Sequence, residues 1–160
     1  MTQVTALLHI AIDAMSGDHG PSVCVPAAVA AAREFGDVRF TPIGRQPELD
    51  RELGSAFPPN VSCLHAAEVV EMTDHPREAL RRKKDSSMRR AIDLVKANDA
   101  HACVSAGNTG ALMATAHFVL KMLPGVERPA IVSMIPSRGG HTYMLDLGAN
   151  ASCKIGRAHV

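Results

Sequence analysis

Three short turns rich in glycine and small polar residues could bind a small anion. They are residues 13–21, 105–110 and 146–150, and each follows an apolar run typical of a strand. In open α/β sheets, ligands bind where such turns leave the carboxyl ends of the strands. Small residues let the backbone approach an anion closely, and the N–H groups at the start of a following helix can donate to it. We therefore expect a ligand near these turns, and a phosphate-like anion at residues 105–110.

The turn at residues 105–110 has the most donors. Ser105, Asn108 and Thr109 could add hydrogen bonds to those of the backbone, while Gly107 and Gly110 keep the turn open. The alternative is an ordinary turn from a strand into a helix, capped by Asn108 or Thr109. The chain has neither GxGxxG nor GxxxxGK[ST], which argues against dinucleotide or P-loop nucleotide binding.

Basic residues gather between positions 77 and 90. Seven of these fourteen residues are basic: Arg77, Arg81, Arg82, Lys83, Lys84, Arg89 and Arg90. Because the formal net charge of the chain is only +1, this local excess could attract a phosphate or an acidic protein partner. The alternative is a solvated helix face. Lys83 and Lys84 precede a helix that begins with Ser86 and Ser87, so cations and helix N–H groups could converge on one phosphate.

Other candidate groups lie in or beside the same turns. Asp13, Asp18 and Asp146 could orient a cation, a base or a metal ion, and capping of a nearby turn or helix explains each equally well. His19, in the first turn, is the one histidine that we single out. None of the eight histidines has the spacing of a metal motif such as HExxH. Cys103 is a weaker candidate nucleophile, because a thiol in mid-strand is buried away from stabilising cations.

Strands and helices that alternate along the chain must position these turns. Apolar runs predict strands over residues 7–13, 38–43, 61–64, 101–106, 130–135 and 143–147. Capping signals and apolar periodicity predict helices over residues 21–35 and 46–53, from Pro76, from Ser86 and over residues 112–120. Asp74 or His75 is expected to cap the third helix and Ser86 the fourth. This alternation indicates an α/β fold with a parallel sheet covered on both faces.

The composition is that of a globular protein. Of the 160 residues, 46% are hydrophobic and 21% charged. The near-neutral charge and the 3% of aromatic residues argue against a nucleic-acid partner. The four cysteines (Cys24, Cys63, Cys103 and Cys153) lie far apart and are expected to be reduced thiols. We recognise no secretory signal and no apolar run long enough to span a bilayer, and therefore expect a cytoplasmic protein.

Several of these segments together resemble a known family. IAIDAM at residues 10–15, followed by GDHGP at 17–21, is similar to the opening signature of the bacterial acyl-ACP:phosphate acyltransferases of phospholipid synthesis, where ACP is acyl carrier protein. Later blocks of that family match, in the same order, HPR at 75–77, residues 83–89, ACVSAGNTGALM at 102–113 and DLGAN at 146–150. The resemblance runs from about residue 10 to residue 154.

The resemblance implies transfer of a fatty acyl group from acyl carrier protein to inorganic phosphate. The product, acyl phosphate, would feed a membrane glycerol-3-phosphate acyltransferase. The family is implied to be a cytoplasmic homodimer, loosely associated with the membrane, that uses no metal or organic cofactor. Its implied fold is a three-layer αβα arrangement around a mostly parallel sheet, related to phosphotransacetylases and isocitrate-type dehydrogenases.

The candidate residues divide by expected role. The catalytic candidates are Lys84, Asn108, Asp13 and His19. The candidates for phosphate binding are Lys83, Ser86, Ser87, Arg89, Ser105, Gly107, Thr109 and Gly110. Further site candidates are Gly17, Asp18, Asp146 and Asn150, and the expected surface for the acidic carrier protein comprises Arg77, Arg81 and Arg82. Such groups could hold a desolvated phosphate against a thioester carbonyl and stabilise the developing oxyanion.

Two other functions stay open on the sequence alone. One is a phosphotransacetylase-like or dehydrogenase-like enzyme that acts on a small anionic substrate. The other is a module that binds phosphate or an acidic protein without catalysis. Turnover of acyl-ACP, compared with acetyl-CoA or NAD, would separate the three.

The chain departs from the family pattern in two places and is expected to be truncated. Ser16 stands where the family usually has glycine, so a positive φ there would strain the turn. Ala151-Ser152 stands where the family usually has Val-Asp, which puts any role of position 152 in doubt. Residues 1–154 are expected to form the N-terminal part of one α/β catalytic domain and residues 155–160 a non-native tail. The chain by itself is expected to be inactive.

Overall fold

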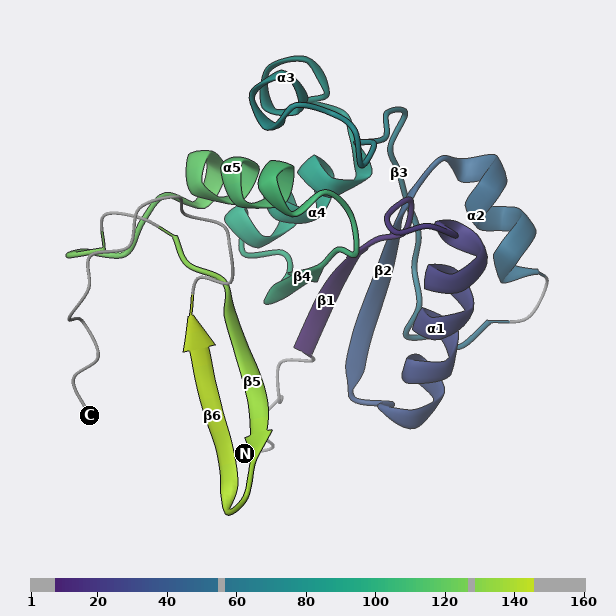
Figure 1. Ribbon diagram of the computed structural model, residues 1–160. Helices are drawn as coiled ribbons and strands as arrows, with labels where there is room; N and C mark the ends of the chain where they lie inside the picture. Colours follow the sequence, from purple (N-terminus) through teal and green to yellow (C-terminus); the bar gives the residue numbers. More distant parts are fainter. Residues whose placement is uncertain (1–7, 55–56, 127–128, 146–160) are drawn as a thin grey trace, which may run out of the picture. The chain divides into compact units, whose positions relative to one another are not determined.

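Two compact units make up this computed structural model, which describes residues 8–54, 57–126 and 129–145. The first unit extends to Lys121 and the second begins at Met122. The elements of the first unit are β1 (Leu8–Asp13), α1 (Pro21–Glu34), β2 (Val38–Gly44), α2 (Gln46–Leu53), β3 (Leu64–His65), α3 (Pro76–Arg82), α4 (Ser87–Lys96), β4 (Ala102–Val104) and α5 (Thr109–Leu120) (Figure 1).

The strands of the first unit form one parallel sheet in the order β3-β2-β1-β4. From β1 the chain moves outward through α1 to β2 and through α2 to β3, and then returns to place β4 on the other side of β1. Helices α1 and α2 pack together on one face of the sheet, and α4 and α5 pack together on the other (Figure 1). The α/β fold class and the three-layer arrangement predicted from the sequence are confirmed.

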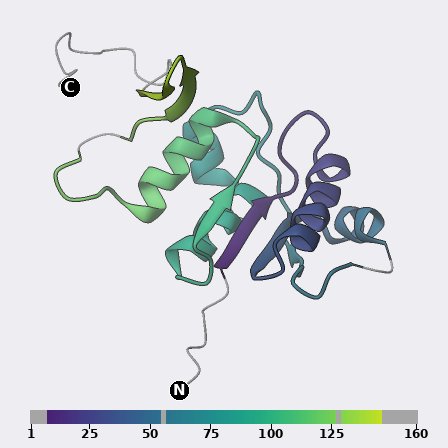
Figure 2. The ribbon, with the colours of Figure 1, turned by 90° about the horizontal axis from the view of Figure 1, so that it is seen from below.

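This topology creates a switch point between β1 and β4, which lie side by side (Figure 2). The connections that leave β1 and β4 run to helices on opposite faces of the sheet, α1 and α5 respectively. Open α/β sheets bind their ligands outside the carboxyl ends of the strands at such a point. The turns at residues 13–20 and 105–110 both begin there.

Side chains of β1 alternate between two apolar cores. Ile10 and Ile12 pack into the core shared with α1 and β2, whereas Ala11 faces the opposite core, together with Ala91 of α4. Because helices cover both faces, residues 40–44 of β2 are all buried. The alternation of apolar and polar residues along this strand in the sequence therefore does not correspond to alternating exposure.

Side-chain caps fix where three of the helices begin. His75 caps α3, Ser86 caps α4 and Asn108 caps α5, each by accepting a hydrogen bond from a backbone N–H of the first turn. The structure thus selects His75 over Asp74 and Asn108 over Thr109, and it confirms the prediction for Ser86. Helix α1 instead begins at Pro21 and has no side-chain cap.

The edge strands are shorter than predicted. β3 covers only Leu64–His65 instead of residues 61–64, and Val61 makes an isolated bridge to Phe40. β4 stops at Val104 instead of residue 106. It ends there because the next residues turn away from the sheet to form hydrogen bonds with the turn that follows β1.

The second unit contains an antiparallel hairpin of β5 (Val132–Ser137) and β6 (Gly140–Leu145). These strands correspond to the predicted runs at 130–135 and 143–147 with shifted ends; residues 146 and 147 lie outside the described residues. Only two residues separate the strands, so they pair antiparallel, because a parallel pair needs a long crossover connection.

The side chain of Ile92 tests the packing between α4 and the helices beside it. It is fully buried in the core formed with residues of α3 and α5. We expect Ile92→Ala to lower the free energy of unfolding by about 2–5 kcal/mol, because it leaves a cavity in a packed core. Denaturant titration measures the change. Lys96→Ala, one turn further along α4 and exposed, should change it by less than about 0.5 kcal/mol; equal losses in both variants would contradict the packing.

Candidate functional site

Side-chain hydrogen bonds join the two turns at the switch point. The Ser105 hydroxyl donates to Oδ2 of Asp13 over 2.7 Å. The Ser16 hydroxyl accepts from the backbone N–H of Ala106 over 2.9 Å and donates to the carbonyl oxygen of Asp13 over 2.6 Å. The carboxyl end of β1 and that of β4 are therefore fixed to one another by polar groups as well as by the sheet.

Asp13 is a buried carboxylate that is only half satisfied. It is 3% exposed, and its Oδ1 atom accepts no hydrogen bond from the described residues. Burial raises the pKa of the Asp13 carboxyl above its ordinary value, and the nearby hydroxyls of Ser87 and Ser105 offset this only in part. A buried polar atom without a partner costs stability, and shifted carboxyl groups of this kind gather at functional sites.

Tight packing in the two turns explains several of their small residues. Gly17 has a φ of 78°, which favours glycine, and a Cβ there would lie 3.4 Å from Cβ of Ala106. A Cβ on Gly107 would lie 3.3 Å from atoms of Met88, Ser105 and Ser16. Ser16 itself is not among the described residues with positive φ. The strain considered for serine at this position therefore does not arise.

Residues 66–75 form a strap between β3 and α3, which polar side chains fasten to the site. The Asn108 amide donates to three strap carbonyls, those of Glu71, Met72 and Asp74, at 3.4, 3.0 and 2.9 Å. Lys83 donates to the carbonyl of Val69 over 2.8 Å and forms an ion pair of 2.5 Å with Asp74. The hydrogen bond from Lys83 lowers the pKa of the Asp74 carboxyl. Asn108 and Lys83 thus hold the strap in place.

Most of the predicted phosphate ligands already have partners within the protein. Ser86 caps α4, and the buried Ser87 donates its backbone N–H to the carbonyl of Glu68. Arg89 forms an ion pair of 2.9 Å with Asp93. Thr109 and Gly110 are different, because they are exposed and occupy the first turn of α5, where N–H groups have no partner within the helix. That these residues bind phosphate stays a prediction.

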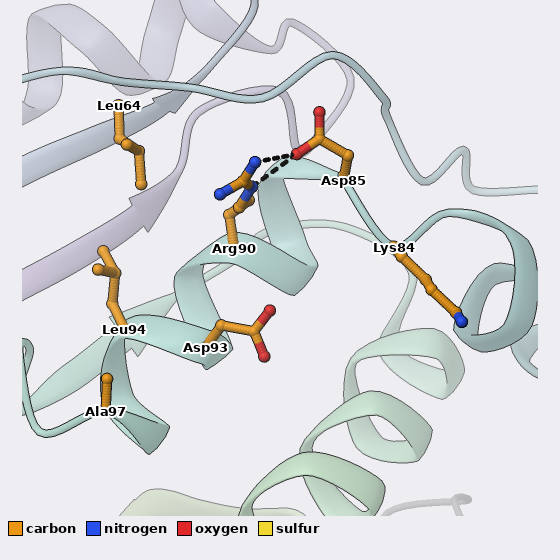
Figure 3. A pocket seen from close by; sticks show the side chains of 7 residues that line it. All are labelled: Leu64, Lys84, Asp85, Arg90, Asp93, Leu94 and Ala97. Carbon is orange, nitrogen blue, oxygen red and sulfur yellow. Dashed lines mark hydrogen bonds and ion pairs between the residues drawn. The ribbon is translucent and has the colours of Figure 1, made fainter.

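Lys84 lies at a hollow of about 570 Å³ beside the edge strand β3 (Figure 3). Leu64 and Leu94 supply apolar wall, and Arg90 crosses the hollow to pair with Asp85 over 2.6 Å. Figure 3 shows the Lys84 side chain extending away from this ion pair. Asn108 is not among the residues that line this hollow, so Lys84 and Asn108 do not converge there.

Asp18 and His19 border a second cavity, of about 430 Å³. Both are exposed, in the turn between β1 and α1. The other residues that line the cavity are Ser16, Gly17, Gly20, Val23, Cys24, Met72 and Ala106. The first turn, the strap and the turn after β4 therefore share one opening.

The remaining described candidates lie on α3. Arg77, Arg81 and Arg82 are exposed on α3, where Arg82 forms a surface ion pair of 3.5 Å with Glu78. Asp146 and Asn150 lie outside the described residues.

The described thiols are unpaired and poorly activated. Cys24, Cys63 and Cys103 are free cysteines, as predicted. Burial raises the pKa of Cys63 to about 11 and also raises the pKa of Cys24 and of Cys103. Because the thiolate is the nucleophile, these shifts disfavour a role of Cys103 in acyl transfer.

The residues that the structure describes contain no cluster of three or more His, Cys, Asp or Glu side chains placed to hold a metal ion. None of the described helices is both long and apolar enough to cross a membrane.

Comparison with known proteins matches the sequence to a family. A family model described as fatty acid synthesis protein matches residues 8–157. The chain belongs to this family. Curated relatives named phosphate acyltransferase include those of Methylococcus capsulatus (57% identical over 90% of this chain), Nitrosococcus oceani (56% over 88%) and Ectopseudomonas mendocina (52% over 90%). These matches cover 42–44% of the relatives' own length. The resemblance inferred from the motifs is confirmed.

Sequence reasoning missed two features of the site that this family member contains. Ser16 had been noted only as a departure, yet its hydroxyl links the two turns. The strap was not identified, because its fastening depends on contacts between residues up to 37 positions apart. The only local signal for it is a segment of polar and turn-forming residues just before Pro76.

Asp13→Asn should separate stability from activity. The amide still accepts from Ser105 and removes a buried charge, so we expect the free energy of unfolding at pH 7 to rise by about 1 kcal/mol. In a protein of the relatives' full length, a reaction catalysed at this site should slow at least a hundredfold, since proton transfer and orientation by such groups contribute about that much.

The pH dependence gives a second check on Asp13. The native state binds the Asp13 proton more tightly than the unfolded chain, because the pKa is raised in the fold. The free-energy penalty for burying the charged form is therefore fully present above the raised pKa, shrinks as the pH falls below it, and vanishes below the ordinary pKa of an aspartate. The difference in the free energy of unfolding between Asp13→Asn and wild type should therefore decrease as the pH is lowered. Asp18→Asn, in the exposed part of the same turn, should show no such gap.

Proposed function

We propose that a protein of the relatives' full length carrying this sequence transfers a fatty acyl group from acyl carrier protein to inorganic phosphate. A phosphate oxygen attacks the thioester carbonyl, a C–O bond forms, and the C–S bond breaks. The proton of hydrogen phosphate ends on the departing thiol, so acyl-ACP and HPO₄²⁻ yield acyl phosphate and the free thiol of the carrier. The printed names of the relatives, phosphate acyltransferase, support this reaction class.

The proposal rests on one observation: hydrogen bonds join the 13–20 turn to the 105–110 turn at the switch point. The Asp13–Ser105 hydrogen bond fixes a hydroxyl beside the first turn of α5, whose N–H groups can receive an anion. In this proposal Thr109 and Gly110 donate to phosphate through their backbone, with Ser105 and Gly107 behind them. Donors that are held in place before the reaction stabilise the developing oxyanion without a cost of reorganisation.

Two of the proposed catalytic groups lie in or beside the first turn: Asp13 orients Ser105, and His19 is placed to exchange a proton. Lys84 borders the separate hollow beside β3 and is proposed to supply positive charge from there. Asn108 contributes by capping α5. Lys83, Ser86, Ser87 and Arg89 lie at or just before the start of α4, and Lys83 fastens the strap there. Gly17 and Asp18 belong to the first turn. Asp146 and Asn150 are proposed as further residues of the site.

Exposed arginines on α3 suit the carrier protein. Arg77, Arg81 and Arg82 occupy a short helix that follows the strap directly. Clustered basic charge accelerates encounter with an acidic partner and fixes its orientation. We propose that acyl carrier protein docks on this face of α3.

The wider setting follows from the reaction. Acyl phosphate is an activated donor, and the proposed consumer is a membrane glycerol-3-phosphate acyltransferase of phospholipid synthesis. We propose a homodimer in the cytoplasm that associates with the membrane periphery to pass on this product. No metal or organic cofactor enters the proposed step.

Phosphate saturation tests the proposed reaction. With acyl-ACP as donor, the intact protein should form acyl phosphate at a rate that saturates with phosphate. Lys84→Ala should raise KM for phosphate about tenfold or more, since hydrogen bonds to charged groups contribute about 1.5–3 kcal/mol. Lys96→Ala, at the far end of α4, is the control and should match wild type. If the wild-type protein forms no acyl phosphate, the proposed function is refuted. If KM for phosphate is unchanged in Lys84→Ala, only the proposed role of Lys84 is refuted.

Charge reversal tests the docking face on α3. The double variant Arg77→Glu and Arg81→Glu should raise KM for acyl-ACP about tenfold at low salt, because close charge complementarity governs encounter. The ratio to wild type should shrink as ionic strength rises, since salt screens exposed charges. Steady-state kinetics at two salt concentrations measure both effects. Arg33→Glu, exposed on α1, serves as the control; an equal effect there would point to net charge instead of a docking face.

A further inference from the structure

The 430 Å³ cavity beside the first turn has apolar walls from three separate segments. Val23 and Cys24 come from α1, Met72 from the strap and Ala106 from the turn after β4. Val23 is 54% exposed and Met72 58% exposed, although both are large apolar side chains. The volume lies within the range of small-molecule sites, about 300–1,000 Å³. Apolar side chains left open around a cavity of this size mark a surface that an apolar ligand would cover.

This cavity is continuous with the candidate site. Ser16 and Ala106, which line it, are the residues whose hydrogen bond joins the two turns. Asp13 contacts both turns as well: its carbonyl oxygen accepts from the Ser16 hydroxyl, and its carboxylate accepts from the Ser105 hydroxyl. A ligand in the cavity would therefore end beside the place proposed for phosphate.

The charge at the cavity favours an uncharged ligand over a second anion. Asp18 and His19 are among the lining residues, and none of the described residues that line the cavity is a lysine or an arginine. A phosphate placed here would face the carboxylate of Asp18, and such like-charge contacts are unfavourable. A chain of methylene groups meets no such penalty.

We propose that this cavity receives the acyl chain of the donor, next to the thioester carbonyl, and that Val23 and Met72 form its walls. The inference rests on the proposed function and goes beyond it by assigning the acyl group a place in the chain. The two substrates then approach from different sides, with the acyl group between α1 and the strap and the phosphate at the start of α5.

Asn108 acts as a positioning residue for this cavity. Its amide holds the carbonyl of Met72 at 3.0 Å and those of two neighbouring strap residues, while its Oδ1 caps α5 over 3.0 Å. One side chain thereby fixes the Met72 wall relative to the anion-binding helix. Loss of the Asn108 amide would leave Met72 and the strap free to move, but it would remove no side chain that touches the acyl chain.

Val23→Glu tests the cavity, with Ala30→Glu as its matched control. Both positions are exposed on α1, two turns apart on one side of the helix, but only Val23 lines the cavity. In the intact protein, Val23→Glu should raise KM for a long-chain acyl-ACP at least tenfold and leave KM for phosphate unchanged. The wild-type preference for longer chains, roughly fourfold per buried methylene, should be lost. Ala30→Glu should behave as wild type.

Equilibrium binding of acyl-ACP, measured without phosphate, separates the two proposals. Binding by wild type that strengthens with chain length and is lost in Val23→Glu supports the cavity, even if no acyl phosphate is formed. Acyl phosphate formation with an unchanged chain-length profile in Val23→Glu overturns the cavity and leaves the proposed function standing. Absence of both binding and turnover overturns both.

Asn108→Ala tests the positioning role. KM for long-chain acyl-ACP should rise at least fivefold, and KM for phosphate should rise as well, because this variant also loses the cap on α5. Asn108→Asp, which keeps the cap on α5 but loses the amide donors, should show the same rise in the donor KM. A rise confined to KM for phosphate, or a fall in kcat alone, would overturn the assignment of Asn108 to the strap.

Discussion

The buried hydrogen bond between Asp13 and Ser105 is the constraint on which the site depends. It joins residues 92 positions apart, and it exists only because β1 and β4 are neighbours in a parallel register that pairs Ile12 with Val104. A carboxylate at 3% exposure, with one oxygen that accepts no hydrogen bond from the part of the chain that the structure describes, is unfavourable for the fold. The apolar cores on both faces of the sheet must supply the stability that keeps it there. Such a group is retained for what it positions.

Close packing around that bond accounts for the small residues of both turns. Gly107 lies against Met88 of α4 and against Ser16, and Gly110 lies against Pro76 of α3, where a Cβ would be 3.0 Å from Cγ of the proline. The starts of three helices therefore meet over the carboxyl ends of two strands. Larger side chains would push these helix starts apart and, with them, the N–H groups that face an anion.

Local signals in the sequence were sufficient for the fold class and for the helix starts, because Ser86, His75 and Asn108 cap through neighbours two or three residues away. They also located both turns of the site. The sequence could not reveal that the Asn108 amide reaches the strap, or that Ser16 reaches Ala106, because these bonds depend on which strands become neighbours. For the same reason the lengths of β3 and β4 were overestimated, since their ends are set by partners distant in the chain.

The basic run at residues 77–90 shows why charge counted along a sequence does not by itself locate a ligand. Lys83, Arg89 and Arg90 pair with Asp74, Asp93 and Asp85, so the fold itself uses their charge. Two of these acids, Asp74 and Asp93, lie outside the basic run in the sequence, and the fold brings them next to its cations. Lys84 and the α3 arginines Arg77, Arg81 and Arg82 are the exposed remainder, and Arg82 makes a surface ion pair with Glu78. One charged segment thus serves two purposes: its inner cations hold α4 and the strap in place, and its outer cations face solvent, where an anionic partner can reach them.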